Sequence, residues 1–413
     1  MILSKYKLET NFIIYLFGKI ISAGAIILSI PIFIKIFGVE EYGNFVFLYT
    51  IFLMVFSGFS GWINQGILRF YTLENNHKRM NKEIEQMSLI SFILASVLLS
   101  FIFYFYNENN VTLILGVLCL YFSISYSTNL TIQQSLLKSK RFIKGDIIRA
   151  LTFIIVPVIF YYILPENYNP TNILFFGVLS SYFIGGIYFS KFNFIKIKVK
   201  LDKTRWSSIF LKYGIPLAFW VIFSPTTNGV DRIIIEYSLG AVAVAKFSAI
   251  FDIVFKLFSS LSVPFNNIVQ PLLIKSYNEK NTQEYISTMK KAVIYLTSMF
   301  IIFLGSILFF KEFILCNYLG FCSDVNLLSK LIFPLTVSSY FWQLSVLLQK
   351  NIEVTNRTVY IATYMLIVVI LMTIFGLFYV PKYGLIGSAY ISLAGASIYL
   401  TFIIYDTKKY FKI

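Results

Sequence analysis

Gly38-Val-Glu-Glu-Tyr-Gly-Asn-Phe45 closes one apolar segment of the chain and opens the next. Gly240-Ala-Val-Ala-Val-Ala-Lys-Phe247, near the middle of the chain, does the same with glycine and phenylalanine at the same spacing. This repeated join predicts two copies of one helical unit. Membrane proteins built from two such copies are usually transporters, in which the halves move about a shared central site.

The composition places the chain in a membrane. Hydrophobic residues make up 58% of it and charged residues only 13%, more apolar surface than a soluble domain can bury. Runs of roughly twenty apolar residues give about twelve predicted spans, near 12–36, 43–68, 87–106, 111–137, 146–164, 171–190, 208–230, 233–274, 292–310, 325–349, 358–380 and 384–405. The eighth of these runs is too long for one simple crossing and must project from the bilayer or be broken.

The net charge of +16 is explained by membrane topology. Most of the lysines and arginines fall in alternate loops and at both ends of the chain, whereas the opposite loops hold only Lys35, Arg232, Lys311 and Lys382. Loops rich in lysine and arginine stay in the cytoplasm, so both termini are predicted to be cytoplasmic. The excess charge then faces anionic lipid, and nucleic acid is not an expected partner.

The longest cytoplasmic loop divides the chain into two halves of similar size. We predict an N-terminal six-helix lobe at 1–190, a basic linker at 191–207 and a C-terminal six-helix lobe at 208–413. Within the linker, apolar and basic residues alternate, which fits either an interfacial strand or a solvated basic segment. The expected fold is therefore an all-α integral membrane protein of two pseudo-symmetric six-helix bundles around a central cavity.

The sequence offers little catalytic chemistry. The sole histidine, His77, lies in a basic loop, and no residues have metal-ligand spacing or form a glycine-rich phosphate loop. The outer loops are too short for a catalytic domain, so neither an enzyme nor a cofactor is expected. Cys316 and Cys322 share an outer loop and fit either a disulfide or two free thiols, whereas Cys119 is expected to pack inside a span.

The candidate functional residues are the polar groups inside the spans, because a charge at the bilayer centre costs roughly 2.5–3.5 kcal/mol. Lys19 and Lys246 have no obvious local acid, which favours a functional role. Arg149 has a simpler explanation, since it can extend to the cytoplasmic surface. The full set comprises the charged residues Lys19, Arg149, Asp231, Arg232, Glu236, Lys246, Asp252 and Lys256, and the neutral residues Asn64, Gln65, Gln133, Gln134, Asn266, Asn267 and Gln270.

The acidic residues of this set lie in the second half. Asp252 and Lys256 are four residues apart, the spacing of an intrahelical ion pair. The adjacent Asp231 and Arg232 point in different directions on a helix and must find different partners, in salt bridges between the lobes or in transport. The spans of the first half are expected to contain no interior Asp or Glu, so a cavity lined by them attracts anions.

Three motifs resemble those of the bacterial polysaccharide flippases, which export O-antigen and capsule repeat units. Pro31-Ile-Phe-Ile-Lys-Ile-Phe-Gly-Val-Glu-Glu-Tyr-Gly43 resembles their first-helix signature, and Asp231-Arg232-Ile-Ile-Ile resembles their junction of spans seven and eight. Lys382-Tyr-Gly-Leu-Ile-Gly-Ser-Ala-Tyr390 resembles the start of their last span. The chain departs from the family at Ala245, where glycine is common.

The resemblance implies the fold of the multidrug, oligosaccharidyl-lipid and polysaccharide exporter superfamily. It also implies that the cargo is an undecaprenyl-pyrophosphate-linked oligosaccharide, flipped to the outer leaflet of the bacterial inner membrane by alternating access. Glycan polymerase and chain-length machinery are further expected partners. The alternatives are a cation-coupled multidrug exporter, a flippase for a cell-wall lipid precursor, a glycan polymerase or ligase, and an assembly scaffold.

The physical demands of such a cargo suggest roles for the candidate residues. Lys19 and Lys246 are expected to bind the pyrophosphate, with Arg232 assisting on the outer side. Asparagine and glutamine side chains are suited to the sugar hydroxyls. Coupling to H⁺ or Na⁺ through Asp231 or Asp252 is left open. The expected cavity residues are Lys19, Lys246, Arg232, Asn64, Gln65, Arg149 and Lys256.

Overall fold

The structure, a computed structural model, is built from α-helices. It describes residues 2–74, 76–106, 108–136, 138–164, 168–189, 205–224, 229–355 and 357–411. Their contacts group into two compact units, of which unit 1 is Met1–Ile26 with Leu48–Asn228, and unit 2 is Ile27–Phe47 with Gly229–Ile413. The chain passes from unit 1 into unit 2 at Ile27 and again at Gly229. These two positions lie equally far before Gly38 and Gly240.

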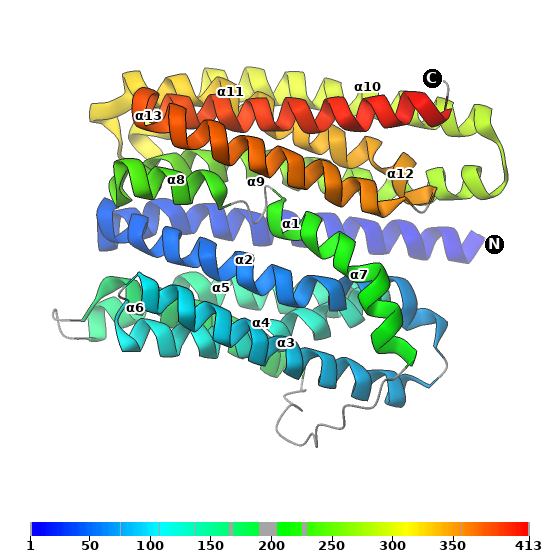
Figure 1. Ribbon diagram of the computed structural model, residues 1–413, viewed down its shortest axis with the longest axis horizontal. Coiled ribbons are helices and arrows are strands. Elements are labelled where there is room, and N and C mark those ends of the chain that lie inside the picture. Colours follow the sequence, from blue (N-terminus) through cyan, green and yellow to red (C-terminus); the bar gives the residue numbers. More distant parts are fainter. Residues whose placement is uncertain are drawn as a thin grey trace. The chain divides into compact units, whose positions relative to one another are not determined.

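Unit 1 is a helical bundle in which α6 packs against both α4 and α5, and α3 packs against α4 (Figure 1). Asparagine caps help to begin its helices, since the side chains of Asn109 and Asn169 accept hydrogen bonds from the backbone N–H of Val111 and Thr171. Its elements are the first part of α1 (Ile2–Phe37), most of α2 (Val39–Phe70), η1 (Tyr71–Leu73), α3 (His77–Phe105), α4 (Asn110–Ser135), α5 (Ser139–Ile163), α6 (Pro170–Tyr188) and α7 (Arg205–Phe223).

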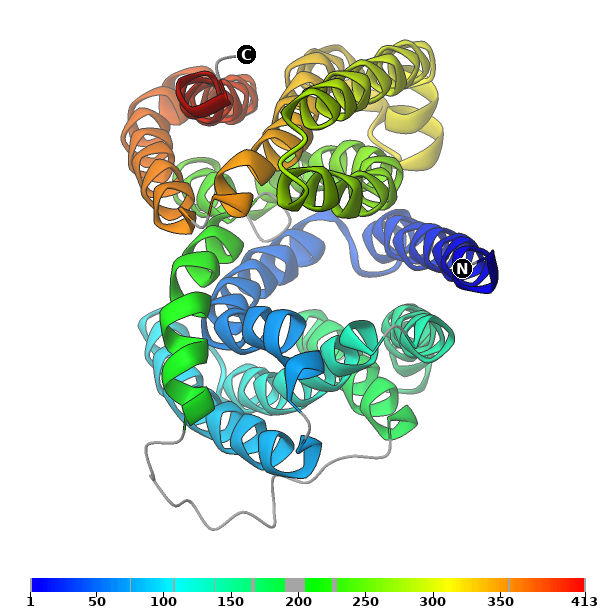
Figure 2. The ribbon, with the colours of Figure 1, turned by 90° about the vertical axis from the view of Figure 1, so that its right-hand side faces the viewer.

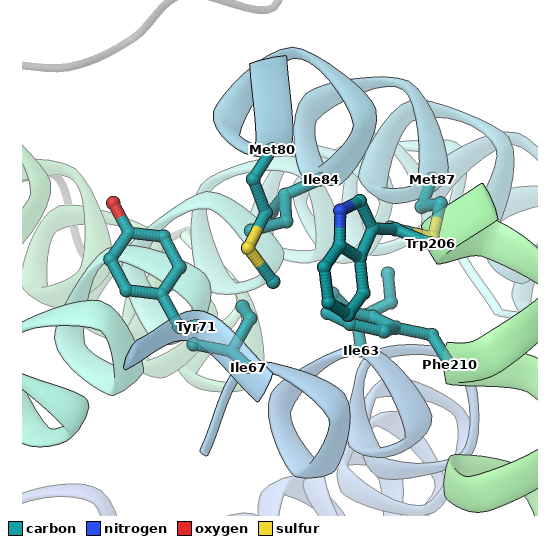
Figure 3. Packing of buried hydrophobic residues seen from close by; sticks show 8 residues of the cluster. All are labelled: Ile63, Ile67, Tyr71, Met80, Ile84, Met87, Trp206 and Phe210. Carbon is teal, nitrogen blue, oxygen red and sulfur yellow. The ribbon is translucent and has the colours of Figure 1, made fainter. Parts of the chain in front are cut away.

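Helix α7 belongs to unit 1, although the predicted C-terminal lobe begins at 208. Trp206 and Phe210 of α7 lie in a buried cluster with Ile63 of α2 and Met87 of α3 (Figure 3). The indole Nε1–H of Trp206 also donates a hydrogen bond to Glu74 at 2.9 Å. The prediction of two lobes about a linker at 191–207 stays a prediction, because residues 190–204 of this loop lie outside the described part of the chain.

Unit 2 contains the second glycine join and the long C-terminal helices. The two arms of α13, which Figures 1 and 2 show side by side in orange and red, meet at Gly384, whose φ of 61° breaks the helix. Its elements are the end of α1 and start of α2, α8 (Val230–Leu239), α9 (Ala241–Asn278), α10 (Thr282–Phe309), η3 (Phe313–Tyr318), η4 (Cys322–Asp324), α11 (Val325–Leu348), α12 (Lys350–Val354) and α13 (Thr358–Phe411).

The two joins have the same backbone geometry, as the repeat predicts. Gly38 and Gly240 both have positive φ, at 88° and 80°, a conformation that glycine adopts without steric cost. The joins also touch each other, because a Cβ on Gly43 would lie only 2.0 Å from the carbonyl oxygen of Ala241. A side chain at position 43 is thus excluded by the backbone of the other copy.

The number of crossings agrees with the prediction. Ten helices of the described residues are long and apolar enough to cross a membrane. The second arm of α13 and the long, charged α9 bring the number to twelve. The predicted eighth span, 233–274, is indeed broken, at Gly240. The seventh span, predicted at 208–230, corresponds to α7, which ends at Phe223, and α8 begins at Val230.

Candidate functional site: charged groups within the helices

The most concentrated charge inside unit 2 lies between α8 and α9. Arg232 Nη2 of α8 is 2.6 Å from Asp252 Oδ1 of α9, and Lys256 Nζ is 3.1 Å from the other oxygen of the same carboxylate. The side chains of Arg232, Asp252 and Lys256 are 10%, 16% and 33% exposed. We call these three residues the cationic cluster. Counted by themselves, these three residues comprise two cations and one carboxylate, an excess of one positive charge.

The sequence predicted part of this cluster. The intrahelical pair of Asp252 and Lys256 is confirmed at 3.1 Å. The expectation that Asp231 and Arg232 find different partners is also confirmed. Arg232 pairs with Asp252, whereas the carboxylate of Asp231 accepts a hydrogen bond from the hydroxyl of Ser392 on α13. Both partners lie within unit 2.

Asp231 is a buried acid held by a neutral group. Asp231 is 5% exposed, and Ser392 is 2% exposed. The carbonyl oxygen of Ser392 accepts a further hydrogen bond from Ser338 of α11 at 3.0 Å, so the chain of contacts connects α8, α13 and α11. The carboxylate of Asp231 thus has a hydroxyl beside it, whereas the carboxylate of Asp252 lies between two cations.

Lys246 has an acidic partner that the sequence did not reveal. Its Nζ lies 2.7 Å from Asp324 Oδ2, and the two side chains are 23% and 38% exposed. Lys246 has no acid close to it in the sequence, as expected, because its partner lies 78 residues away. The pair connects the second join to the segment beside Cys316 and Cys322, which form a disulfide.

The first half contains an interior acid, contrary to expectation. Asp146 lies on α5, which begins at Ser139, and is 5% exposed. It forms an ion pair with Arg149 at 3.2 Å, and the guanidinium of Arg149 lies 5.7 Å from the ring centre of Tyr182. Arg149 is therefore engaged inside unit 1 and does not extend to the surface as predicted.

The remaining predicted cavity residues are spread along unit 1. Lys19 lies on α1, but its side chain is outside the described part of the structure. Asn64 and Gln65 are half-buried on α2, and the Asn64 amide donates a hydrogen bond to Ser127 at 3.4 Å. These residues belong to unit 1, whereas Arg232 and Lys256 belong to unit 2.

An apolar groove of about 510 Å³ lies between the two arms of α13. Its walls include Met372 and Phe375 from the first arm and Ile391, Ala394 and Ile398 from the second. This groove could not be predicted from the sequence, because it depends on how the two arms pack on either side of Gly384.

Comparison with solved structures identifies the fold. "Lipid II flippase MurJ, inward closed conformation" matches with a TM-score of 0.68 and 17% identity, covering 99% of this chain and 88% of that one. An inward-facing multidrug resistance MATE family transporter of the MOP superfamily matches with a TM-score of 0.65 and 14% identity, covering 97% and 98%. The chain has the fold of these transporters.

A MOP superfamily transporter from Pyrococcus furiosus, with a binding pocket described as of reverse polarity, matches with a TM-score of 0.67 and 12% identity over 97% of this chain and 95% of its own. No protein-family model matches the sequence, and no curated protein is significantly similar to it. The predicted superfamily fold and multi-pass membrane class are thus confirmed, whereas the polysaccharide flippase family stays a prediction.

Proposed function

We propose that this protein is a flippase that moves undecaprenyl-pyrophosphate-linked oligosaccharide across the bacterial inner membrane by alternating access. The observation that carries the proposal is the excess positive charge of the cationic cluster within the helices of unit 2. A pyrophosphate cannot enter hydrocarbon without compensation of its charge. Arg232 and Lys256 offer donors that suit phosphate oxygens.

The fold supports this class of cargo. A protein named for lipid II flipping shares the architecture over nearly the whole chain. We place the prenyl tail along the apolar groove of α13, where it contacts aliphatic and aromatic side chains. We prefer surface-polysaccharide repeat units as the cargo, because the sequence motifs at Gly38, Asp231 and Gly384 resemble those of the polysaccharide flippases. Anionic lipid and the glycan polymerase are further proposed partners.

A second candidate is a cation-coupled multidrug exporter. Asp231 favours it, because a buried carboxyl bonded to a neutral hydroxyl is suited to bind a proton or a cation. The excess charge of the cationic cluster opposes it, since cationic drugs need an acidic site. The same Asp231 is compatible with a flippase driven by H⁺ or Na⁺.

A deletion strain separates these functions. We expect lipid-linked repeat units to accumulate on the inner leaflet, with unchanged susceptibility to cationic drugs. The wild-type gene should restore export, and a variant with Arg232 and Lys256 both replaced by glutamine should not. Increased drug susceptibility with normal surface glycan indicates the exporter instead. Accumulation of the cell-wall precursor, with loss of viability, indicates the precursor flippase.

A further inference from the structure

A polar pocket of about 260 Å³ lies within unit 1, where α3 and α4 meet the start of α5. Serine, threonine, asparagine and glutamine side chains form much of its wall, and Lys138 and Arg141 stand at its exposed side. It is distinct from the cationic cluster, which belongs to unit 2. Its volume lies just below the roughly 300–1,000 Å³ of sites for drug-sized ligands, so it suits a polar ligand smaller than a typical drug.

Three polar atoms of this pocket lack partners within the described part of the chain. Ser88 and Ser125 are 0% and 1% exposed, and their hydroxyl oxygens make no hydrogen bond. The side-chain carbonyl oxygen of Gln133 is likewise buried and unbonded. A buried polar group without a partner costs about 1–3 kcal/mol. These unbonded groups come from two helices and line one cavity. A ligand with several hydroxyls bonds to them and removes this cost.

The remaining walls suit a phosphorylated ligand. Arg141 has a planar fork of donors that matches phosphate, and Lys138 adds a second positive charge. Glu85 also lines the pocket and, as a carboxylate, accepts hydrogen bonds from hydroxyls.

Tyr71 closes one side of the pocket. Burial raises the pKa of its hydroxyl above the ordinary value, so the group stays protonated and donates to Asn81 at 2.9 Å. Figure 3 shows its ring against Met80 and Ile67, with the hydroxyl directed away from the apolar cluster. The pocket therefore has an apolar support behind Tyr71 and polar groups inside.

We propose that this pocket binds a phosphorylated polyol, with Arg141 and Lys138 on the phosphate and Ser88, Ser125 and Gln133 on the hydroxyls. Two sources supply this chemistry: a soluble sugar phosphate, or the phosphoglycerol headgroup of an anionic lipid. The inference does not depend on the transport proposed above, since it concerns other residues in the other unit.

Calorimetry on the full chain, purified in a neutral detergent, tests the proposal. The probes are N-acetylglucosamine 1-phosphate, sn-glycerol 3-phosphate, N-acetylglucosamine and inorganic phosphate. We expect a phosphorylated polyol to bind more tightly than either the unphosphorylated sugar or phosphate. Arg141→Gln should weaken it at least ten-fold. The control Lys140→Gln removes an exposed charge one residue away, outside the pocket, and should leave affinity unchanged.

A second pair of variants tests the buried hydroxyls. Ser125→Ala should weaken the polyol phosphate but not inorganic phosphate. Ser135→Ala, on the same helix, removes a hydroxyl that is already bonded to the carbonyl of Ile132 and should change neither. Thermal unfolding of each variant identifies any that is misfolded. Equal weakening by Arg141→Gln and Lys140→Gln would overturn the proposal, since it indicates unspecific charge.

Nanodiscs distinguish the two sources. If the soluble probes do not bind, phosphatidylglycerol nanodiscs should raise the melting temperature relative to phosphatidylcholine nanodiscs, and Arg141→Gln should remove the increase. That result assigns the headgroup to the lipid. If soluble probes do bind, they should compete with this effect. Absence of both binding and an Arg141-dependent increase rejects the pocket as a site.

Discussion

Arg232 Nη2 lies 2.6 Å from Asp252 Oδ1, so an ion pair spans the second glycine join and holds α8 against α9. Lys256 occupies the other oxygen of that carboxylate. Asp252 is therefore shared by two cations, and loss of each member has a different consequence.

The order of stability among single neutral variants follows from this sharing. Asp252→Asn leaves two cations close together and should cost most, at the upper end of the roughly 3–5 kcal/mol for breaking a buried pair. Arg232→Gln should cost less than this range, below about 3 kcal/mol, because Lys256 still neutralises Asp252. Lys256→Gln should cost least. Thermal unfolding in detergent checks the order, with the exposed Lys330→Gln as control. Equal effects of all three variants contradict a shared carboxylate.

The close approach of the two joins predicts a steric penalty at Gly43. A Cβ there meets the backbone oxygen of Ala241, which cannot move away like a flexible side chain. Gly43→Ala should destabilise the protein by about 1–3 kcal/mol, the usual cost of overpacking. Gly305→Ala is the matched control, because that helical position has open space around it. Because alanine is less flexible than glycine, Gly305→Ala should stabilise its helix by up to about 1 kcal/mol. Similar melting temperatures of the two variants exclude the contact.

Asp231 provides a test of ion coupling. Asp231→Asn keeps an oxygen that accepts the Ser392 hydrogen bond but cannot exchange a proton. We expect the variant to fold and its transport rate in proteoliposomes to be insensitive to an imposed pH gradient. Ser392→Ala, which keeps the carboxyl, should retain the response to the gradient. If Asp231→Asn responds to the gradient like the wild type, Asp231 is not the coupling group.

The groove of α13 predicts a dependence on the length of the prenyl tail. Ala394→Trp fills the groove between the arms and should slow transport of a long prenyl cargo several-fold, with little effect on a short one. Ile370→Trp adds the same side chain at an exposed position of α13 outside the groove. Equal slowing of both cargoes by Ala394→Trp shows that the tail does not use the groove.

Local features of the fold could be predicted, and distant pairings could not. Gly38 and Gly240 were recognised because glycine at a repeated spacing indicates a turn, and Asp252 with Lys256 because their spacing fixes their geometry. The partners of Lys246 and Asp231 lie 78 and 161 residues away, where no local rule applies.

Two other features were missed for identifiable reasons. Asp146 was placed at the start of a span because basic residues before it lower the local hydropathy, yet α5 already begins at Ser139. The polar pocket of unit 1 was missed because Ser88 and Ser125 are common residues in apolar helices. Only their shared cavity distinguishes them.

In the proposed mechanism, the excess positive charge of the cationic cluster carries the pyrophosphate of the cargo. Lys256→Gln removes that excess and leaves the Arg232–Asp252 pair in place. The decisive measurement is the flipping rate, in proteoliposomes, of a fluorescent oligosaccharide linked to undecaprenyl pyrophosphate or to uncharged undecaprenol. We predict that the wild type moves the pyrophosphate form faster, and that Lys256→Gln slows this form at least ten-fold, or about 1.4 kcal/mol. Equal rates for both lipids, or an unchanged rate in a folded Lys256→Gln variant, would contradict this role of the cationic cluster.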